Sequence, residues 1–238
     1  METARPAVVV DFDGTITTTD SSEALARRFA GPGWEEIQRQ YASGAFGMRT
    51  WHQRIPALMN HNTCDMLDYL LPRLQLRQGF VAFCQYAADH RLRLVVASDG
   101  LGFYIAPFLR SHGLEWLEVR TNTFSQGVVS HPHGHPGCPV CGNCKARTVR
   151  ELRRQSGRVV FVGDGFNDRF GSSHADAVLA LSGGRLEEHC VSRSLPHWSW
   201  RDFCDVKTWF EQGPIYPGPH PVCPSTPELE WADHPADR

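Results

Sequence analysis

The sequence predicts an α/β protein, with a Rossmann-like, doubly wound and mostly parallel sheet and a small inserted helical cap. Three observations support this fold class. Short apolar runs alternate with stretches of helical periodicity along most of the chain. The first run, Ala7–Val10, is continuously apolar, as expected of a strand that is buried on both faces. The helical stretch after it is too long for one crossover between parallel strands.

The elements are predicted in order from apolar spacing and from breakers. After the strand at 7–10, Asp20 or Ser21 caps a helix to residue 30, where a Gly-Pro-Gly run ends it. Amphipathic stretches predict the next helices, over residues 34–41, 48–59, 63–71 and 79–90. Strand-like runs then follow at 92–97, 117–124, 159–162 and 177–181. Helical patterns over 103–112 and 145–155 separate most of these strands.

This order of elements predicts three regions. Residues 1–17 and 76–210 form the α/β core, and residues 18–75 form the helical cap inserted after the first strand. Residues 211–238 contain seven prolines and little periodicity, so we expect an extended or disordered tail.

Composition and charge exclude several classes of protein. The 238 residues include 24 basic and 26 acidic side chains, so no strong field favours nucleic acid or an anionic membrane. No apolar run approaches the roughly 18 residues of a membrane helix. The first residues lack the apolar core of a signal peptide. We expect a cytoplasmic monomer or homodimer with no nucleic-acid or membrane partner.

Acidic and hydroxyl side chains follow three of the predicted strands. They are Asp11 and Asp13 after the first strand, Ser98 and Asp99 after the second, where Gly100 follows, and Asp164 and Asp168 after residues 159–162. Because parallel strands end at one edge of a sheet, these groups should gather there, with Lys145 at the start of a nearby helix. Carboxylates alone would repel one another, and Mg²⁺ would relieve that repulsion by oxygen ligation.

The charges predict a phosphoryl-transfer chemistry. A carboxylate attacks phosphorus only when the phosphoryl oxygens are neutralised, so Asp11 is the expected nucleophile and forms an aspartyl-phosphate. Asp13 would protonate the leaving alcohol and then deprotonate water. Two sets of residues complete the site. Mg²⁺ would be bound by Asp11, Asp13 and Asp164, with Asp168 as an auxiliary ligand or a structural partner of Lys145, and the phosphate by Ser98, Asp99, Gly100 and Lys145.

In this order the four segments resemble the haloacid dehalogenase-like superfamily. Its phosphatases carry Asp-x-Asp on the first strand, Ser or Thr on the second, a later Lys, and a Gly-Asp-x-x-x-Asp motif. The second aspartate, Asp13 here, is typical of its phosphatases and mutases. The segments after Ser98 and before Lys145 are similar to the branch of the methionine-salvage and phosphoserine phosphatases. That branch commonly has a second glycine where this chain has Asp99.

A cysteine- and histidine-rich segment, residues 131–144, precedes Lys145. It holds three thiols and three imidazoles. One interpretation is a structural Zn²⁺ site made by Cys138, Cys141, Cys144 and His135. The other is that the thiols pack as small hydrophobic groups and the histidines are solvated.

The predicted cap would determine substrate choice because it closes over the leaving group. Arg49, Trp51, His52 and Arg54 are candidates to contact a small polar substrate. The alternative is that Trp51 anchors the core of the cap and Arg54 is a surface charge. A small cap favours small phosphorylated metabolites over proteins.

Together these features predict a Mg²⁺-dependent phosphomonoesterase. The resemblance implies the methionine-salvage enol phosphate as one substrate, and phosphoserine, phosphocholine, a sugar phosphate or a nucleotide as others. Two further hypotheses stay open. A mutase or phosphotransferase needs the same aspartate pair, and a non-catalytic metal- or metabolite-binding module would use the cysteine segment and the tail.

Overall fold

The computed structural model describes residues 5–59 and 62–219, and these contain one sheet in the order β4-β3-β2-β1-β5-β6-β7. The strands are β1 (Ala7–Val10), β2 (Arg93–Leu101), β3 (Glu118–Ser125), β4 (Val128–Ser130), β5 (Val159–Gly163), β6 (Ala177–Leu181) and β7 (Trp198–Trp200). All neighbours pair in parallel except β3 and β4. The predicted fold class, a doubly wound and mostly parallel α/β sheet, is therefore confirmed.

The first strand lies at the centre of the sheet. Val8 pairs with Leu94 of β2 on one side and with Val160 of β5 on the other. All four residues of β1 are fully buried, as the unbroken apolar run predicts. The residue that follows β1, Asp11, therefore lies at the middle of the sheet's carboxyl edge.

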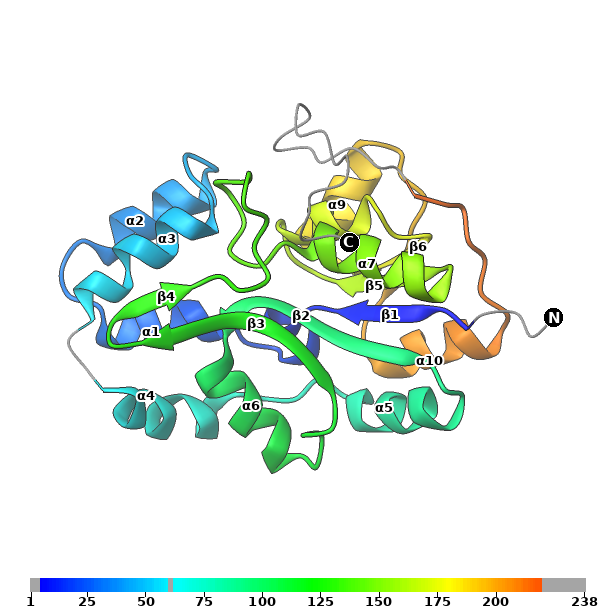
Figure 1. The fold of residues 1–238 in the computed structure, drawn as a ribbon, viewed down its shortest axis with the longest axis horizontal. Coiled ribbons are helices and arrows are strands. Elements are labelled where there is room, and N and C mark those ends of the chain that lie inside the picture. Colours follow the sequence, from blue (N-terminus) through cyan, green and yellow to red (C-terminus); the bar gives the residue numbers. More distant parts are fainter. Residues whose placement is uncertain (1–4, 60–61, 220–238) are drawn as a thin grey trace.

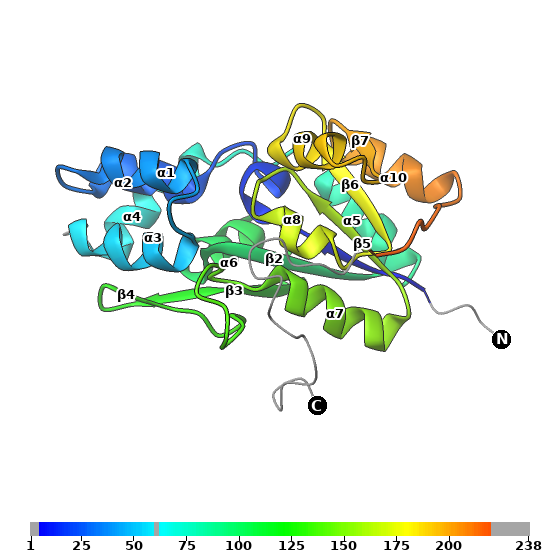
Figure 2. The same ribbon diagram turned by 90° about the horizontal axis from the view of Figure 1, so that it is seen from above.

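Helices cover both faces of the sheet (Figures 1 and 2). The helices of this part are α5 (Phe80–Asp89), α6 (Gly102–Ser111), α7 (Lys145–Ser156), α8 (Asp168–Ser172), α9 (Arg185–Ser192) and α10 (Phe203–Glu211). On one face Val8 and Val10 belong to a core that α5, α6 and α10 complete. On the other face Val9 packs in a core with apolar residues of α7 and α9. The alternation of odd and even residues along β1 thus builds two hydrophobic layers.

Four helices lie between β1 and α5. They are α1 (Ser21–Phe29), α2 (Trp34–Ala42), α3 (Met48–Arg54) and α4 (Thr63–Leu70), with short 3₁₀ turns at Pro56–Leu58 and Leu71–Arg73. Figure 1 shows these helices gathered on the side of the molecule toward which β1 points, beside β3 and β4. Asp20 caps α1 as predicted, by accepting a hydrogen bond of 2.8 Å from the Glu23 amide. Assignment of residues 18–75 as a separate cap domain stays a prediction.

The structure differs from the predicted elements at several points. The helix expected over 48–59 ends at Arg54, because Pro56 has no amide to continue it. Two three-residue strands, β4 and β7, and helices α8 to α10 were not predicted. Glu211, the first residue of the predicted tail, is the last residue of α10. Residues 213–219 form neither helix nor strand, and residues 220–238 lie outside the described residues. No helix in the described ranges is long and apolar enough to cross a membrane.

Candidate active site

Asp11 leaves the central strand just before an irregular turn, Phe12–Ile16, in which Asp13 and Gly14 depart from helical dihedral angles. Asp11 is 7% exposed. The turn depends on Gly14, whose φ of 78° is unfavourable for residues with a Cβ. A Cβ at this position would lie 2.3 Å from Oδ2 of Asp164. Glycine therefore allows the turn after β1 to approach the loop after β5.

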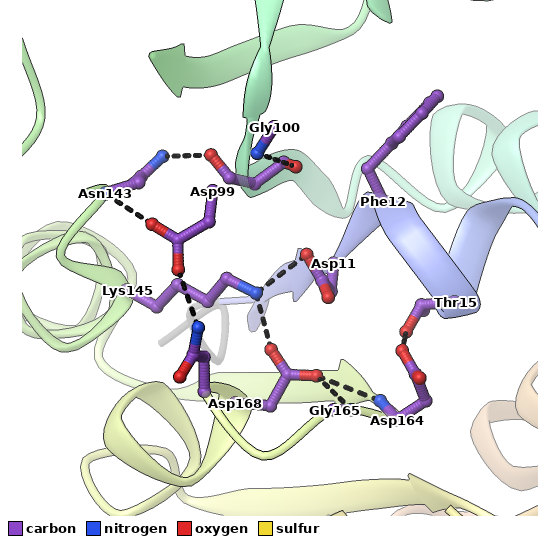
Figure 3. A network of polar contacts seen from close by, with 12 residues as sticks. Asp11, Phe12, Thr15, Asp99, Gly100, Asn143, Lys145, Asp164, Gly165 and Asp168 are labelled. Carbon is purple, nitrogen blue, oxygen red and sulfur yellow. Dashed lines mark hydrogen bonds and ion pairs between the residues drawn. The ribbon is translucent and has the colours of Figure 1, made fainter. Parts of the chain in front are cut away.

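Lys145 is the first residue of α7 and is almost fully buried, with 3% exposure. Its Nζ lies 2.7 Å from Oδ1 of Asp11 and 2.6 Å from Oδ1 of Asp168 (Figure 3). Burial alone would lower the pKa of Lys145, but these two carboxylates raise it well above its ordinary value. The lysine is therefore held as an ammonium ion between the turn after β1 and α8.

Asp11, Asp164 and Asp168 form the one group with metal-ligand spacing among the described residues, with ligand atoms within 4.8 Å of one another. Burial and the neighbouring Asp168 carboxylate raise the pKa of Asp164 to about 7. A divalent cation would relieve this crowding of buried carboxylates, and oxygen donors are those that Mg²⁺ prefers. The donor set therefore fits the predicted magnesium.

The carboxylate of Asp168 already has partners on both oxygens. Oδ1 accepts from Lys145, and Oδ2 accepts from the amides of Asp164 and Gly165, each at 2.9 Å (Figure 3). Thr15 donates to Oδ1 of Asp164 at 2.6 Å. These contacts favour Asp168 as a structural partner of the lysine and leave Asp11 and Asp164 to hold the metal.

The carboxylate of Asp13 lines the same cavity as Asp11 and also contacts α1. Its Oδ1 accepts a hydrogen bond of 2.8 Å from the Ser21 amide at the start of α1. Its Oδ2 would lie 2.9 Å from a Cβ on Gly100. Burial raises the pKa of Asp13 to about 7, which suits a group that gives and takes a proton. The geometry supports the predicted acid–base position, whereas metal ligation by this side chain stays a prediction.

The end of β2 supplies the predicted phosphate-binding group. Ser98 is buried, and its Oγ accepts a hydrogen bond of 2.8 Å from the Gly100 amide. A Cβ on Gly100 would come within 2.5 Å of the Tyr104 hydroxyl, so the loop needs glycine there. Ser98, Asp99 and Gly100 all line the cavity that contains Asp11 and Lys145.

This cavity has a volume of about 660 Å³ and lies between the sheet edge and helices α1 to α3. Its floor consists of the strand-end groups described above. Its opposite wall comes from residues that the sequence did not single out, namely Gln38, Tyr41, Phe46, Met48 and Val140, with Phe166 and Asn167 beside α8. No local pattern marks the wall residues, because long-range packing turns them toward the site.

None of the four cap residues chosen from the sequence, Arg49, Trp51, His52 and Arg54, lines this cavity. Arg49 donates to the backbone carbonyls of Cys141 at 2.7 Å and His135 at 2.9 Å. Trp51 is 4% exposed and donates to Gln38, in agreement with its alternative role as a core anchor. Arg54 is exposed and lies over the Phe46 ring. Their predicted substrate contacts have no support in this geometry.

The cysteine segment is not arranged as a zinc site. Within residues 5–59 and 62–219, no three of its thiols and imidazoles reach metal-ligand spacing. Cys138 and Cys141 pack with Phe170, and a hydrogen bond from Cys141 lowers the pKa of Cys138 to about 5. Cys144 is buried, and His135 accepts a hydrogen bond from the Gly137 amide. The structural Zn²⁺ prediction is unsupported. Packing as small hydrophobic groups describes Cys141 and Cys144, whereas the lowered pKa of Cys138 favours its thiolate.

A comparison with protein families agrees with the order of these groups along the chain. The family model of the haloacid dehalogenase-like hydrolases matches residues 8–169. The chain belongs to this family. The matched part of this haloacid dehalogenase-like hydrolase contains β1, the end of β2, Lys145 and the loop after β5.

Two relatives that are about 30% identical to this hydrolase are named as phosphatases. A 2-hydroxy-3-keto-5-methylthiopentenyl-1-phosphate phosphatase of Geobacillus thermodenitrificans is 32% identical, over 82% of this hydrolase and 91% of the relative. A phosphatase of the same name from Exiguobacterium sp. is 30% identical, over 86% of this hydrolase and 96% of the relative. A solved phosphoserine phosphatase with a phospho-aspartyl intermediate analogue has a TM-score of 0.64 at 15% identity, over 86% and 98%. That structure supports the fold of the hydrolase.

Proposed function

We propose that this hydrolase is a Mg²⁺-dependent phosphomonoesterase that acts on a small phosphorylated metabolite through an aspartyl-phosphate. The single observation that carries the proposal is the position of Asp11. It follows the central strand, faces a 660 Å³ cavity, and lies 2.7 Å from the buried ammonium of Lys145. A carboxylate nucleophile, a fixed cation and a proton-transfer carboxyl then share one site.

The reaction divides into two steps at Asp11. In the first, an Asp11 oxygen bonds to phosphorus while the bond from phosphorus to the leaving oxygen breaks, and Asp13 protonates that oxygen. In the second, Asp13 takes a proton from water as the water oxygen attacks phosphorus, and the bond to Asp11 breaks to release phosphate. Lys145 and Ser98 hold the phosphoryl oxygens. Asp11 and Asp164 would hold Mg²⁺, which supplies further positive charge.

For the substrate, we propose 2-hydroxy-3-keto-5-methylthiopentenyl-1-phosphate. The wall opposite Asp11 combines the apolar side chains of Phe46, Met48 and Val140 with the amide of Gln38. Such a surface suits a leaving group that has a polar, oxygenated part and an apolar thioether end. Relatives at 30% and 32% identity carry the name of this activity, which supports the same choice.

A second candidate is a phosphate ester with an ammonium on the leaving group, such as phosphoserine or phosphocholine. Asp20 and Glu23 also line the cavity and add carboxylates beyond the predicted reaction centre. Asp20 is used to cap α1, and Glu23 pairs with the exposed Arg27. Because both carboxylates have these partners, the enol phosphate remains the first choice.

Release of inorganic phosphate from a substrate panel tests the proposal. The panel contains the methionine-salvage enol phosphate, phosphoserine, phosphocholine, sugar phosphates and nucleotides, each with Mg²⁺ and with chelator. Asp11→Asn should reduce release by roughly a thousandfold or more, because it removes the nucleophile. A phosphorylated acceptor alcohol in place of free phosphate would identify a phosphotransferase. No turnover of any ester would favour a binding module and contradict the proposal.

A further inference from the structure

The carboxylate of Asp99 joins two loops at the active-site edge. Asp99 is 8% exposed and lies near the end of β2, where the pairing with β3 shifts register. Its Oδ1 accepts a hydrogen bond of 2.7 Å from the Asn143 amide, two residues before Lys145 (Figure 3). Its Oδ2 accepts from Nδ2 of Asn167, in the loop before α8, at 3.3 Å. One buried side chain therefore ties the phosphate-binding loop to the segments that present Lys145 and Asp168.

The same asparagine extends the network to the cap helices. Nδ2 of Asn167 also donates to the hydroxyl of Tyr41 at 2.8 Å. Tyr41 is near the end of α2, and its side chain lines the cavity. Burial raises the pKa of the Tyr41 phenol, and the negative charge of Asp99 raises it further. The two groups therefore interact electrostatically. A continuous series of contacts thus runs from α2 through Asn167 to Asp99.

The donor and acceptor roles in this series are fixed by Asp99. Both of its partners, the Asn143 amide and Nδ2 of Asn167, donate, which suits an ionised carboxylate. Asn167 must therefore present its nitrogen toward Asp99, and the same nitrogen then meets the Tyr41 oxygen. A carboxylate in place of Asn167 would face Asp99 with like charge whenever both groups are ionised.

We propose that Asp99 is a positioning residue that holds α2 over the active site through Asn167 and Tyr41, and that it also orients the segment leading into Lys145. It acts through other residues and takes no part in bond breaking. Its effect on turnover rests on the proposed phosphatase function, whereas its effect on α2 is a property of the protein alone.

The effect of Asp99 on α2, Trp34–Ala42, is tested by amide hydrogen exchange of this helix in metal-free protein without substrate. Asn167→Asp should speed exchange roughly tenfold, because it replaces a hydrogen bond with repulsion. The double variant Asp99→Asn with Asn167→Asp restores a donor opposite a carboxylate, so its exchange should return to within about twofold of the wild type. The control combines Asn167→Asp with Glu23→Gln, which removes a different charge from the cavity. This double variant should not recover the slow exchange of the wild type.

Tyr41→Phe isolates the last contact of the series. It should speed exchange in α2 about as much as Asn167→Asp, since it deletes only the hydroxyl. Tyr69→Phe, on α4 and outside the cavity lining, is the matched control and should leave α2 unchanged. Unchanged exchange in Tyr41→Phe and Asn167→Asp, or no recovery in the Asp99→Asn double variant, would overturn the positioning role.

Turnover of para-nitrophenyl phosphate with Mg²⁺ gives a second measurement. Asn167→Asp should lower kcat by roughly tenfold or more, and the added Asp99→Asn should recover most of that loss. Tyr41→Phe should lower kcat more than it raises KM, because it loosens α2 over the site and leaves the phosphate contacts in place. Failure of the wild type to hydrolyse any phosphate ester would count against the phosphatase function, and the exchange results would still decide the role of Asp99.

Discussion

Nζ of Lys145 lies 2.7 Å from Oδ1 of Asp11, so the buried ammonium directly touches the carboxylate that follows the central strand. Lys145→Arg should lower the rate of phosphate release by roughly a hundredfold or more. A guanidinium is planar and wider than an ammonium, and it does not fit between Asp11 and Asp168 without moving one of them. Steady-state phosphate release with the best ester of the panel measures the effect.

The second lysine of the chain provides the control for this change. Lys207 is on α10 and forms a partly exposed ion pair with Glu211. Lys207→Arg keeps that pair, so its rate should equal that of the wild type. If Lys145→Arg retained a third of the wild-type rate, a compact buried ammonium would not be required.

Asp164 and Asp168 should respond differently to loss of charge. Asp164→Asn should raise the Mg²⁺ concentration for half-maximal activity roughly tenfold or more while the protein stays folded, since it removes a metal ligand. Asp168→Asn breaks a buried ion pair with Lys145 and should lower the free energy of unfolding by about 3 kcal/mol. A magnesium titration and urea unfolding of both variants separate the two roles. A loss of stability in Asp164→Asn, together with a higher Mg²⁺ requirement in Asp168→Asn, would contradict these two roles.

Much of the site could be predicted because strand ends in a parallel sheet meet at one edge. Asp11, Ser98 and Asp164 each follow an apolar run, and the topology alone brings them together. Lys145 could be placed because it begins a helix and is one of only two lysines. These positions depend on local patterns that a sequence contains.

The rest depends on contacts between distant segments. Arg49 has the charge of a substrate-binding residue, yet it satisfies backbone carbonyls about 90 positions along the chain. Tyr41 has no motif, and only the packing of α2 brings it to Asn167. Strand β4 was missed because three residues are too few to show a period of two.

Gly14→Ala should reduce both stability and turnover. Its φ of 78° costs an alanine about 1 kcal/mol, and the new Cβ would collide with the Asp164 carboxylate. We expect a roughly tenfold or larger loss of kcat, measured beside urea unfolding. Gly113→Ala is the control, because it has a φ of 70° with no atom within 4 Å of the added Cβ. It should show the strain cost alone; an equal loss of turnover would show that the carboxylate contact is irrelevant.

The buried His52 should make stability depend on pH. It is 2% exposed on α3, and its Nδ1 lies 3.1 Å from Nε2 of His131. Burial, then the His131 ring, lowers the pKa of His52 to about 3, whereas an unfolded histidine titrates near 6.5. Between those values only the unfolded chain binds the proton, so the contribution of His52 falls as pH falls. At pH 5 the loss relative to pH 7 should be about 2 kcal/mol.

The measurement is the difference in unfolding free energy between pH 7 and pH 5, compared between the wild type and His52→Gln. The variant should lose about 2 kcal/mol less than the wild type over this interval. His90→Gln is the control, because His90 is exposed and lies outside the predicted cap. The loss of unfolding free energy in this variant should match that of the wild type. Burial, and then the charge of Arg49, lowers the pKa of His131, which favours the neutral form of that ring as well. An NMR titration that showed His52 charged at pH 5 in the folded protein would contradict this account.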